Sequence, residues 1–158
     1  MVVMGVPALA VLAGCSTPSP SPAGPAAPGQ DAFFGYDDMV AEYRATLAEL
    51  ELPEGVRLED EVTGVERSGS FQEGFGEVRA VMAWNCVWGR EWLEHRDTDP
   101  ASAAHALDMY ARIVETDAFA TNFDPQSAQP VIEGIIEKAR LGDPTGVQQD
   151  VEANCPVS

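Results

Sequence analysis

The side chains that most often carry out catalysis are sparse in this sequence. The 158 residues contain two histidines, His95 and His105, and no Gly-x-Ser-x-Gly motif that would expose a nucleophilic serine. His95 follows Glu91 by one helical turn, which is the usual spacing of a surface contact on a helix. Neither His-x-x-x-His nor Cys-x-x-Cys spacing occurs, so the sequence offers no transition-metal ligand set. We therefore expect no catalytic residue, no metal and no cofactor.

Two groups of acidic residues are candidates for weak cation binding. Asp97 and Asp99 have the spacing of calcium-loop ligands, but Ala101 and Ser102 stand where that loop needs a ligand and a glycine. Asp99 precedes a proline, so we expect the pair to cap a helix instead. The run Glu59-Asp60-Glu61 could hold a cation or ligand weakly, or it could be a solvated charged loop.

Three tryptophans follow one another at intervals of four residues: Trp84, Trp88 and Trp92. Residues at this spacing share one helix face, where aromatic rings could form a platform that stacks on a sugar. The same face is the widest apolar face of the central helix, which favours rings buried in a helix core over a sugar platform. The three tryptophans and Glu59-Asp60-Glu61 are therefore the candidate ligand or interaction residues.

The N-terminal segment is apolar from Val2 to Leu12 and ends in Leu12-Ala13-Gly14-Cys15. This pattern resembles the lipobox of bacterial lipoproteins. The resemblance implies a signal peptide over residues 1–14 and a mature N-terminus at Cys15 that carries acyl chains such as palmitate. Because two or three chains anchor a protein stably, we expect the domain on the outer face of the cell membrane. The basic residues that usually open a signal peptide are missing. Their absence fits a start codon assigned too far downstream. Two other interpretations of the apolar segment stay open: an uncleaved membrane span, or a segment packed in a core.

Residues 15–30 after this segment form a spacer of serine, proline, alanine and glycine. A segment of this composition has nothing to bury, so we expect it to stay extended and solvated. The remaining residues, 31–158, form the predicted domain.

Two cysteines remain if Cys15 is acylated, namely Cys86 and Cys155. In an exported protein, an even pair is expected to form a disulfide. Free buried thiols are the alternative. The bond would join the middle of a long helix to the end of the chain.

The surroundings of these cysteines resemble a group of small exported lipoproteins of high-GC actinobacteria. The residues that carry the likeness are Trp84-Asn85-Cys86-Val87-Trp88, a Gly142-Asp143-Pro144-Thr145-Gly146 stretch and the terminal Asn154-Cys155-Pro156. The resemblance implies export and paired cysteines, and it brings no known activity.

Helical periodicity dominates residues 31–158. We predict an all-α bundle of four main helices and a short C-terminal helix, stapled by one disulfide. The helices are expected at about 37–52, 71–96, 100–115 and 129–141, with the last one after Pro144. The second is the centre of the fold, and charged residues occupy the side opposite its apolar arc: Glu73, Arg79, Arg90, Glu91 and Glu94. Phe33-Phe34 should fold back onto the domain, and residues 53–70 fit either a short ribbon turning at Thr63-Gly64 or an extended strap.

The net charge of −17 narrows the range of functions. Nucleic-acid binding requires a basic surface, which this chain lacks, whereas an acidic surface favours basic protein partners. We expect a non-catalytic interaction or accessory protein of the cell envelope. The alternatives are a small-molecule or cation-binding lipoprotein and, third, an envelope hydrolase built on paired carboxylates.

Overall fold

The predicted all-α class is confirmed by the structure, a computed structural model that describes residues 33–155. Six α-helices in this part follow one another as α1 (Tyr36–Leu47), α2 (Phe75–His95), α3 (Pro100–Ala111), α4 (Asp117–Asn122), α5 (Ala128–Arg140) and α6 (Thr145–Asn154). Two short strands, β1 (Phe33–Phe34) and β2 (Phe71–Gln72), pair antiparallel, with Phe33 opposite Gln72. The predicted signal peptide, Cys15 and the predicted spacer lie outside the described residues.

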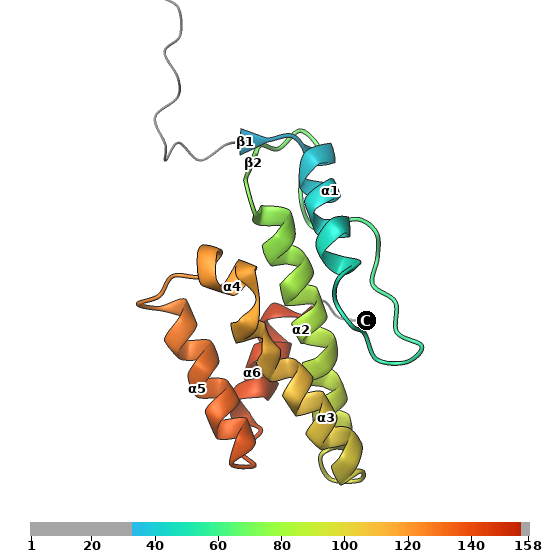
Figure 1. The fold of residues 1–158 in the computed structure, drawn as a ribbon, viewed down its shortest axis with the longest axis vertical. Coiled ribbons are helices and arrows are strands. Elements are labelled where there is room, and N and C mark those ends of the chain that lie inside the picture. Colours follow the sequence, from blue (N-terminus) through green and yellow to red (C-terminus); the bar gives the residue numbers. More distant parts are fainter. Residues whose placement is uncertain (1–32, 156–158) are drawn as a thin grey trace, which may run out of the picture. The chain divides into compact units, whose positions relative to one another are not determined.

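Helix α2 is the central element, with α1 and the strap on one side and α4, α5 and α6 on the other (Figure 1). We use the name strap for residues 53–70, which connect α1 to β2 without forming a strand. Of the two conformations expected for this segment, the structure therefore has the strap and not the ribbon. Phe33-Phe34 does return to the domain, because β1 pairs with β2 at the end of the strap.

The close contact between α1 and α2 depends on a glycine and a glutamate. A Cβ atom at Gly76 would collide with the backbone carbonyl of Met39, so only glycine allows the two helices to approach this closely. Glu42 on α1 then accepts hydrogen bonds from the backbone N–H groups of Gly74, at 3.0 Å, and Gly76, at 3.1 Å. A carboxylate at this position complements the unpaired amides at the start of α2.

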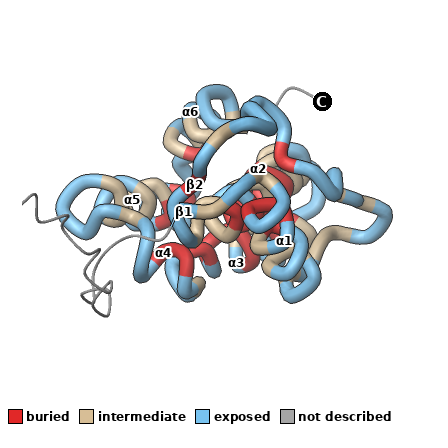
Figure 2. Tube along the Cα trace, turned by 90° about the horizontal axis from the view of Figure 1, so that it is seen from above, coloured by how far each residue is buried: buried red, intermediate tan, exposed pale blue. Residues whose placement is uncertain are grey.

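Two hydrophobic clusters flank α2, and the burial colouring shows the red, buried segments gathered around α2, α3 and α4 (Figure 2). The larger, which we call the tryptophan cluster, joins α2 to α3, α4, α5 and α6 and contains the three tryptophans, Tyr110, Phe119 and Ile136. The smaller, which we call the strap cluster, contains Met39, Val40, Tyr43, Val62, Phe71 and Ala80. The helix is therefore apolar on two sides.

The predicted helix boundaries need three corrections. Helix α1 ends at Leu47 and not at residue 52, because the chain leaves it to pack Leu50 and Leu52 against the tryptophan cluster. Helix α2 begins at Phe75 and not at residue 71, since Phe71 and Gln72 pair with β1.

The third correction concerns residues 100–122. The helix predicted over 100–115 is α-helical only to Ala111 and continues as a 3-10 turn, Arg112–Glu115. The short helix α4 was missed; its first turn is capped by the Thr116 side chain, which accepts from the Phe119 N–H. Within residues 33–155, no helix combines the length and apolarity needed to cross a bilayer.

Candidate functional site

Several hollows on the described domain surface are large enough to receive a ligand or a partner side chain, and two of them bear on function. The strap cavity, about 440 Å³, lies between the strap, α1 and α2. The C-terminal groove, about 820 Å³, lies between α2, α5 and α6. Both volumes fall within the range of small-molecule sites, roughly 300–1,000 Å³.

The strap is held over α1 and α2 by two arginines and one buried valine. Arg44 donates to the backbone carbonyl of Asp60 at 2.8 Å, and Arg79 donates to that of Thr63 at 3.1 Å. Between these anchors Val62 is buried in the strap cluster. The strap is therefore docked along its middle, and its backbone roofs the cavity.

One stripe of α2 forms the floor of the strap cavity. Its members are spaced by four, three, one and three residues along the helix: Arg79, Ala83, Cys86, Val87 and Arg90. The small side chain of Ala83 leaves room in the middle, and an arginine stands at each end, roughly 16 Å apart along the axis. The strap adds apolar roof residues, Val56, Leu58 and Val62, together with Arg57, Glu59 and Glu61.

Tyr43 on α1 closes one wall of the strap cavity and is only 5% exposed. Within the described residues its hydroxyl has no hydrogen-bond partner and is open to solvent, since no buried side-chain oxygen or nitrogen in this part of the chain lacks a partner. Burial raises the pKa of the Tyr43 hydroxyl, the positive charge of Arg79 opposes that rise, and Asp60 and Glu59 add to it. Tyr43 therefore stays a neutral hydroxyl near the Arg79 guanidinium.

The acidic candidates Glu59, Asp60 and Glu61 lie on the strap and are exposed. Glu59 and Glu61 border the strap cavity, so this part of the predicted ligand surface does meet a hollow. Glu61 forms an ion pair with Arg67 at 2.8 Å. The backbone carbonyl of Asp60 accepts the hydrogen bond by which Arg44 holds the strap. Among the described residues, no group of three or more His, Cys, Asp and Glu side chains is arranged to hold a metal ion.

The tryptophans are the main correction to the predicted surface. Trp84, Trp88 and Trp92 are 2%, 3% and 5% exposed, so they form core and cannot present a platform to a sugar. The indole N–H groups of Trp84 and Trp88 both donate to the Glu51 carbonyl, at 2.6 and 3.0 Å. A buried indole needs such a partner, and the chain segment after α1 supplies it.

The predicted disulfide between Cys86 and Cys155 is present, with Cα atoms 5.6 Å apart. It joins the middle of α2 to the residue that follows α6. Cys86 also lines the strap cavity, so the bond lies at the boundary between the two sides of α2.

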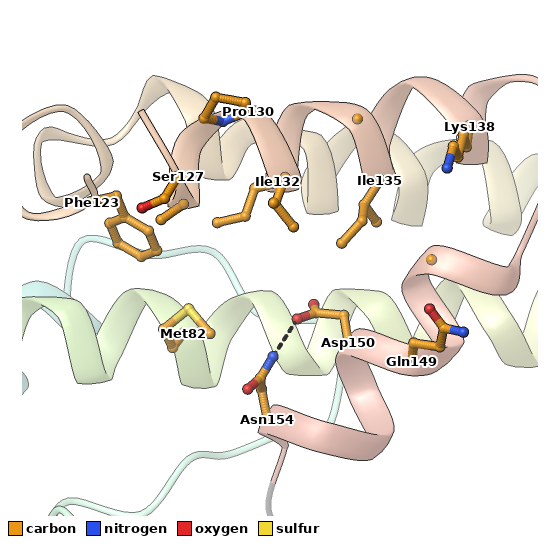
Figure 3. Close-up of a pocket in the computed structure, with 14 residues that line it drawn as sticks. Met82, Phe123, Ser127, Pro130, Ile132, Ile135, Lys138, Gln149, Asp150 and Asn154 are labelled. Carbon is orange, nitrogen blue, oxygen red and sulfur yellow. Dashed lines mark hydrogen bonds between the residues drawn. The ribbon is translucent and has the colours of Figure 1, made fainter. Parts of the chain in front are cut away.

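The C-terminal groove has an apolar centre and polar ends (Figure 3). Ile132 and Ile135 point into it from α5, and Met82 faces them from α2. On the α6 side, Asp150 accepts hydrogen bonds from the Tyr110 hydroxyl at 2.9 Å and from the Asn154 amide at 2.8 Å. Its acidic charge is thus already used in structural contacts. Val131, which also lines the groove, is 61% exposed.

The histidines and the Asp97-Asp99 pair have local roles in the structure. His95 contacts Glu91 at 3.3 Å one turn away, and the His105 ring stands edge-on to Trp88 at a centroid distance of 5.3 Å. Asp99 caps α3 by accepting from the N–H groups of Ala101 and Ser102.

The residues that matter most in the strap cavity were not predicted from the sequence. Arg79 and Arg90 were expected on the charged side of α2, and Arg79 is indeed exposed there, but their place beside a cavity was not predicted and Tyr43 was not singled out. The available signal was the small residue Ala83 between two arginines on one helical stripe. Comparisons of the chain with protein-family models, curated proteins and solved structures found no match, so no relative assigns a role to any of these residues.

Proposed function

We propose that this protein is a lipid-anchored, extracytoplasmic helical domain that acts by binding, as a non-catalytic interaction or accessory protein of the cell envelope. The anchor in this proposal is Cys15, within its lipobox-like sequence. The domain would work on the outer face of the membrane.

The observation that carries the proposal is the disulfide. Such bonds persist in oxidising compartments and are rare in the cytosol, and this one pairs the two cysteines left once Cys15 is acylated. The acidic charge fits the same setting, because it disfavours adsorption to anionic lipid headgroups and favours basic partners.

The C-terminal groove is the surface that we propose for a protein partner. Its isoleucines and the exposed Val131 offer apolar contact, and the charged residues that line it are Lys138 and the already hydrogen-bonded Asp150. A partner segment with apolar side chains would complement the centre of the groove, and the acidic charge of the domain as a whole favours a basic partner.

The hydrolase alternative has weaker support. Burial raises the pKa of Glu77, with smaller effects from Asp117 and Glu42, which is the kind of shift that a general acid needs. However, both carboxylate oxygens of Glu42 are used to cap α2, and Glu77 lines neither the strap cavity nor the C-terminal groove.

The anchor is tested by mass spectrometry of the protein isolated from its native membrane. We expect an acylated N-terminal Cys15 and no free thiol, and we expect Cys15→Ser to release the protein from the membrane fraction while Ser16→Ala leaves it bound. An unmodified N-terminus with three alkylatable cysteines would refute the proposal.

The partner surface is tested by cross-linking in intact membranes followed by pull-down. Val131→Glu should lose the enriched partner, whereas Leu141→Glu should keep it, because Leu141 is equally apolar and 81% exposed but lies outside the groove. Equal enrichment by an unrelated acidic lipoprotein, or loss of the partner by both variants, would contradict the proposed role of the groove.

A further inference from the structure

The strap cavity combines positive charge, a hydroxyl and apolar walls in an otherwise strongly acidic domain. Three of the eight arginines of the chain line it, Arg57, Arg79 and Arg90, against two glutamates. Part of this positive charge is explained by the acidic strap, and Arg90 already has an interaction partner, so the charge available to a ligand lies mainly at the Arg79 end. A requirement to hold negative charge there would explain the placement.

The Arg79 end of the cavity has the geometry of a binding site for an anionic group. The Arg79 guanidinium has five N–H donors, and its hydrogen bond to Thr63 at 3.1 Å uses one of them while fixing the side chain. The Tyr43 side chain is buried except at its hydroxyl, which is open to the cavity and has no hydrogen-bond partner among residues 33–155. An anion placed between the two would accept from both.

The rest of the cavity is suited to an apolar group. Ala83 and Val87 form the floor beyond Arg79, and Val56, Leu58 and Val62 form the roof. The volume of about 440 Å³ accommodates a body of roughly ten to fifteen non-hydrogen atoms. Apolar surface buried there contributes affinity, and the charged end fixes the orientation.

We propose that the strap cavity binds an organic monocarboxylate with an apolar body, whose carboxylate lies between Arg79 and the Tyr43 hydroxyl. Arginine suits a carboxylate because its planar fork can donate two parallel hydrogen bonds. This site goes beyond the proposed accessory role, and it depends on neither the acyl anchor nor the C-terminal groove.

The glutamates of the strap set the limits of this specificity. Glu61 is paired with Arg67 at 2.8 Å, so its charge is compensated outside the cavity. Glu59 is exposed and borders the cavity, and with Asp60 it acts on the Tyr43 hydroxyl, so Arg79 must outweigh their repulsion of the bound carboxylate. A second negative group on the ligand would add to this repulsion, so the site favours one carboxylate on an apolar body.

The test is a titration of the full chain, with its disulfide formed and Cys15→Ser excluding acyl chains. The probes are 4-phenylbutyrate and its matched amine and alcohol, 4-phenylbutylamine and 4-phenylbutanol. Binding is followed by backbone amide shifts. We expect millimolar or tighter binding of the carboxylate, with shifts confined to the strap, α1 and the 79–90 stretch of α2. The amine and the alcohol should bind about tenfold more weakly or worse. A tenfold loss of affinity is what the loss of one charge-assisted hydrogen bond is expected to cause.

Two variants and one control separate the binding role from a structural one. Arg79→Gln should weaken binding of 4-phenylbutyrate at least about tenfold, and Tyr43→Phe by about threefold to tenfold, each consistent with one lost hydrogen bond. Because Arg79 also anchors the strap, Tyr43→Phe is the cleaner variant, since it keeps the ring and removes no hydrogen bond to the strap. Arg140→Gln, the same charge change on α5 away from the cavity, should change affinity less than twofold.

Three outcomes would overturn the proposal. One is binding of the amine as tight as that of the carboxylate, which would mean that the glutamates and not Arg79 determine the charge of the ligand. Another is an equal loss in Arg79→Gln and Arg140→Gln, which would reduce the effect to overall charge. The third is the absence of shifts at millimolar 4-phenylbutyrate while α3 to α6 keep their native amide spectrum.

Discussion

The two sides of α2 differ in what they pack against and in what they leave open. On one side the tryptophan cluster joins α2 to α3, α4, α5 and α6, and its rings are buried. On the other side the strap cluster is small, and an irregular segment and a cavity lie beside it. One helix thus forms the main wall of the core and the floor of a hollow.

The difference follows from residue size and from the partner available on each side. Large aromatic rings on α2 meet regular helices, which can pack closely around them. On the strap side α2 presents Ala83 and two arginines to a loop, and a loop cannot match a helix surface along its whole length. Stability is expected to reside in the first side and ligand recognition in the second.

The largest loss of stability is expected from Trp88→Ala on the tryptophan side. The change removes a buried ring and leaves the Glu51 carbonyl with one indole donor instead of two, at a cost of about 4 to 5 kcal/mol. Urea unfolding measures it. Leu141→Ala, an exposed control, should stay within about 0.5 kcal/mol of the wild type. A loss for Trp88→Ala no greater than for a strap variant would break the comparison.

The disulfide is expected to rank next, because it closes a loop of 69 residues that contains α3 to α6. Replacing both cysteines, Cys86→Ala with Cys155→Ala, should cost about 4 kcal/mol in the chain-entropy description of cross-links. Unfolding with and without reductant checks this. Reductant should destabilise the wild type and leave the double variant unchanged.

Tyr110→Phe tests the link between α3 and α6. It removes the hydroxyl that donates to Asp150 at 2.9 Å, with an expected cost of about 2 kcal/mol at neutral pH. Burial raises the pKa of Tyr110, with further contributions from Asp150, so the folded protein keeps this proton where the unfolded chain begins to lose it, near pH 10.

The stabilising effect of Tyr110 is therefore complete below pH 10 and declines as the pH rises above it. The gap between the wild type and Tyr110→Phe should narrow in that range, as measured by unfolding at pH 8 to 11. A gap that widens with pH would contradict the assignment. Tyr36→Phe, which loses only a 3.5 Å contact to Glu61, is the control.

Val62→Ala probes the strap side and should have a smaller, local effect. The loss of two buried methyl groups is expected to cost about 1 to 1.5 kcal/mol. Hydrogen exchange should quicken in the strap and remain unchanged in α3 to α5. An equal increase throughout the domain would mean that the two sides of α2 unfold as one unit and are not separable.

The smallest effect is expected from Asp99→Asn at the start of α3. A hydrogen bond from the Ser102 side chain, then backbone hydrogen bonds, lower the pKa of the Asp99 carboxyl in the folded state. Its charge therefore stabilises the fold above the unfolded pKa, near 4, and this contribution is lost as the pH falls through the lower folded value. Unfolding at pH 3 to 7 should show wild type and variant converging at the acidic end.

The helices were predictable wherever an apolar stripe is long. Periodicity located α2, α3 and α5 to within a few residues, and Asp99-Pro100 marked the start of α3. Helix α4 was missed because six residues are too few for periodicity to appear. The early end of α1 was also unpredictable, since Leu50 and Leu52 leave it for contacts with residues far along the chain.

The candidate site was less predictable than the fold. Glu59 and Glu61 were identified from composition, and they do border the strap cavity. The tryptophans were offered as a surface because periodicity shows that they share a face but not whether that face is covered. Arg79 is exposed, as its place on the charged side of α2 predicts, but its hydrogen bond to the strap and its position beside the cavity depend on tertiary contacts that the sequence pattern does not contain.

The covalent bond between Cys86 and Cys155 also determines how the domain would respond to tension. A force applied between residues 33 and 155 passes along the chain to Cys86, across the sulfur bridge and out, so it bypasses residues 87–154. Only α1, the strap and the first half of α2 can be stretched. A mechanical load on the domain would therefore open the strap cavity, while α3 to α6 stay folded because the force does not pass through the loop that the disulfide closes.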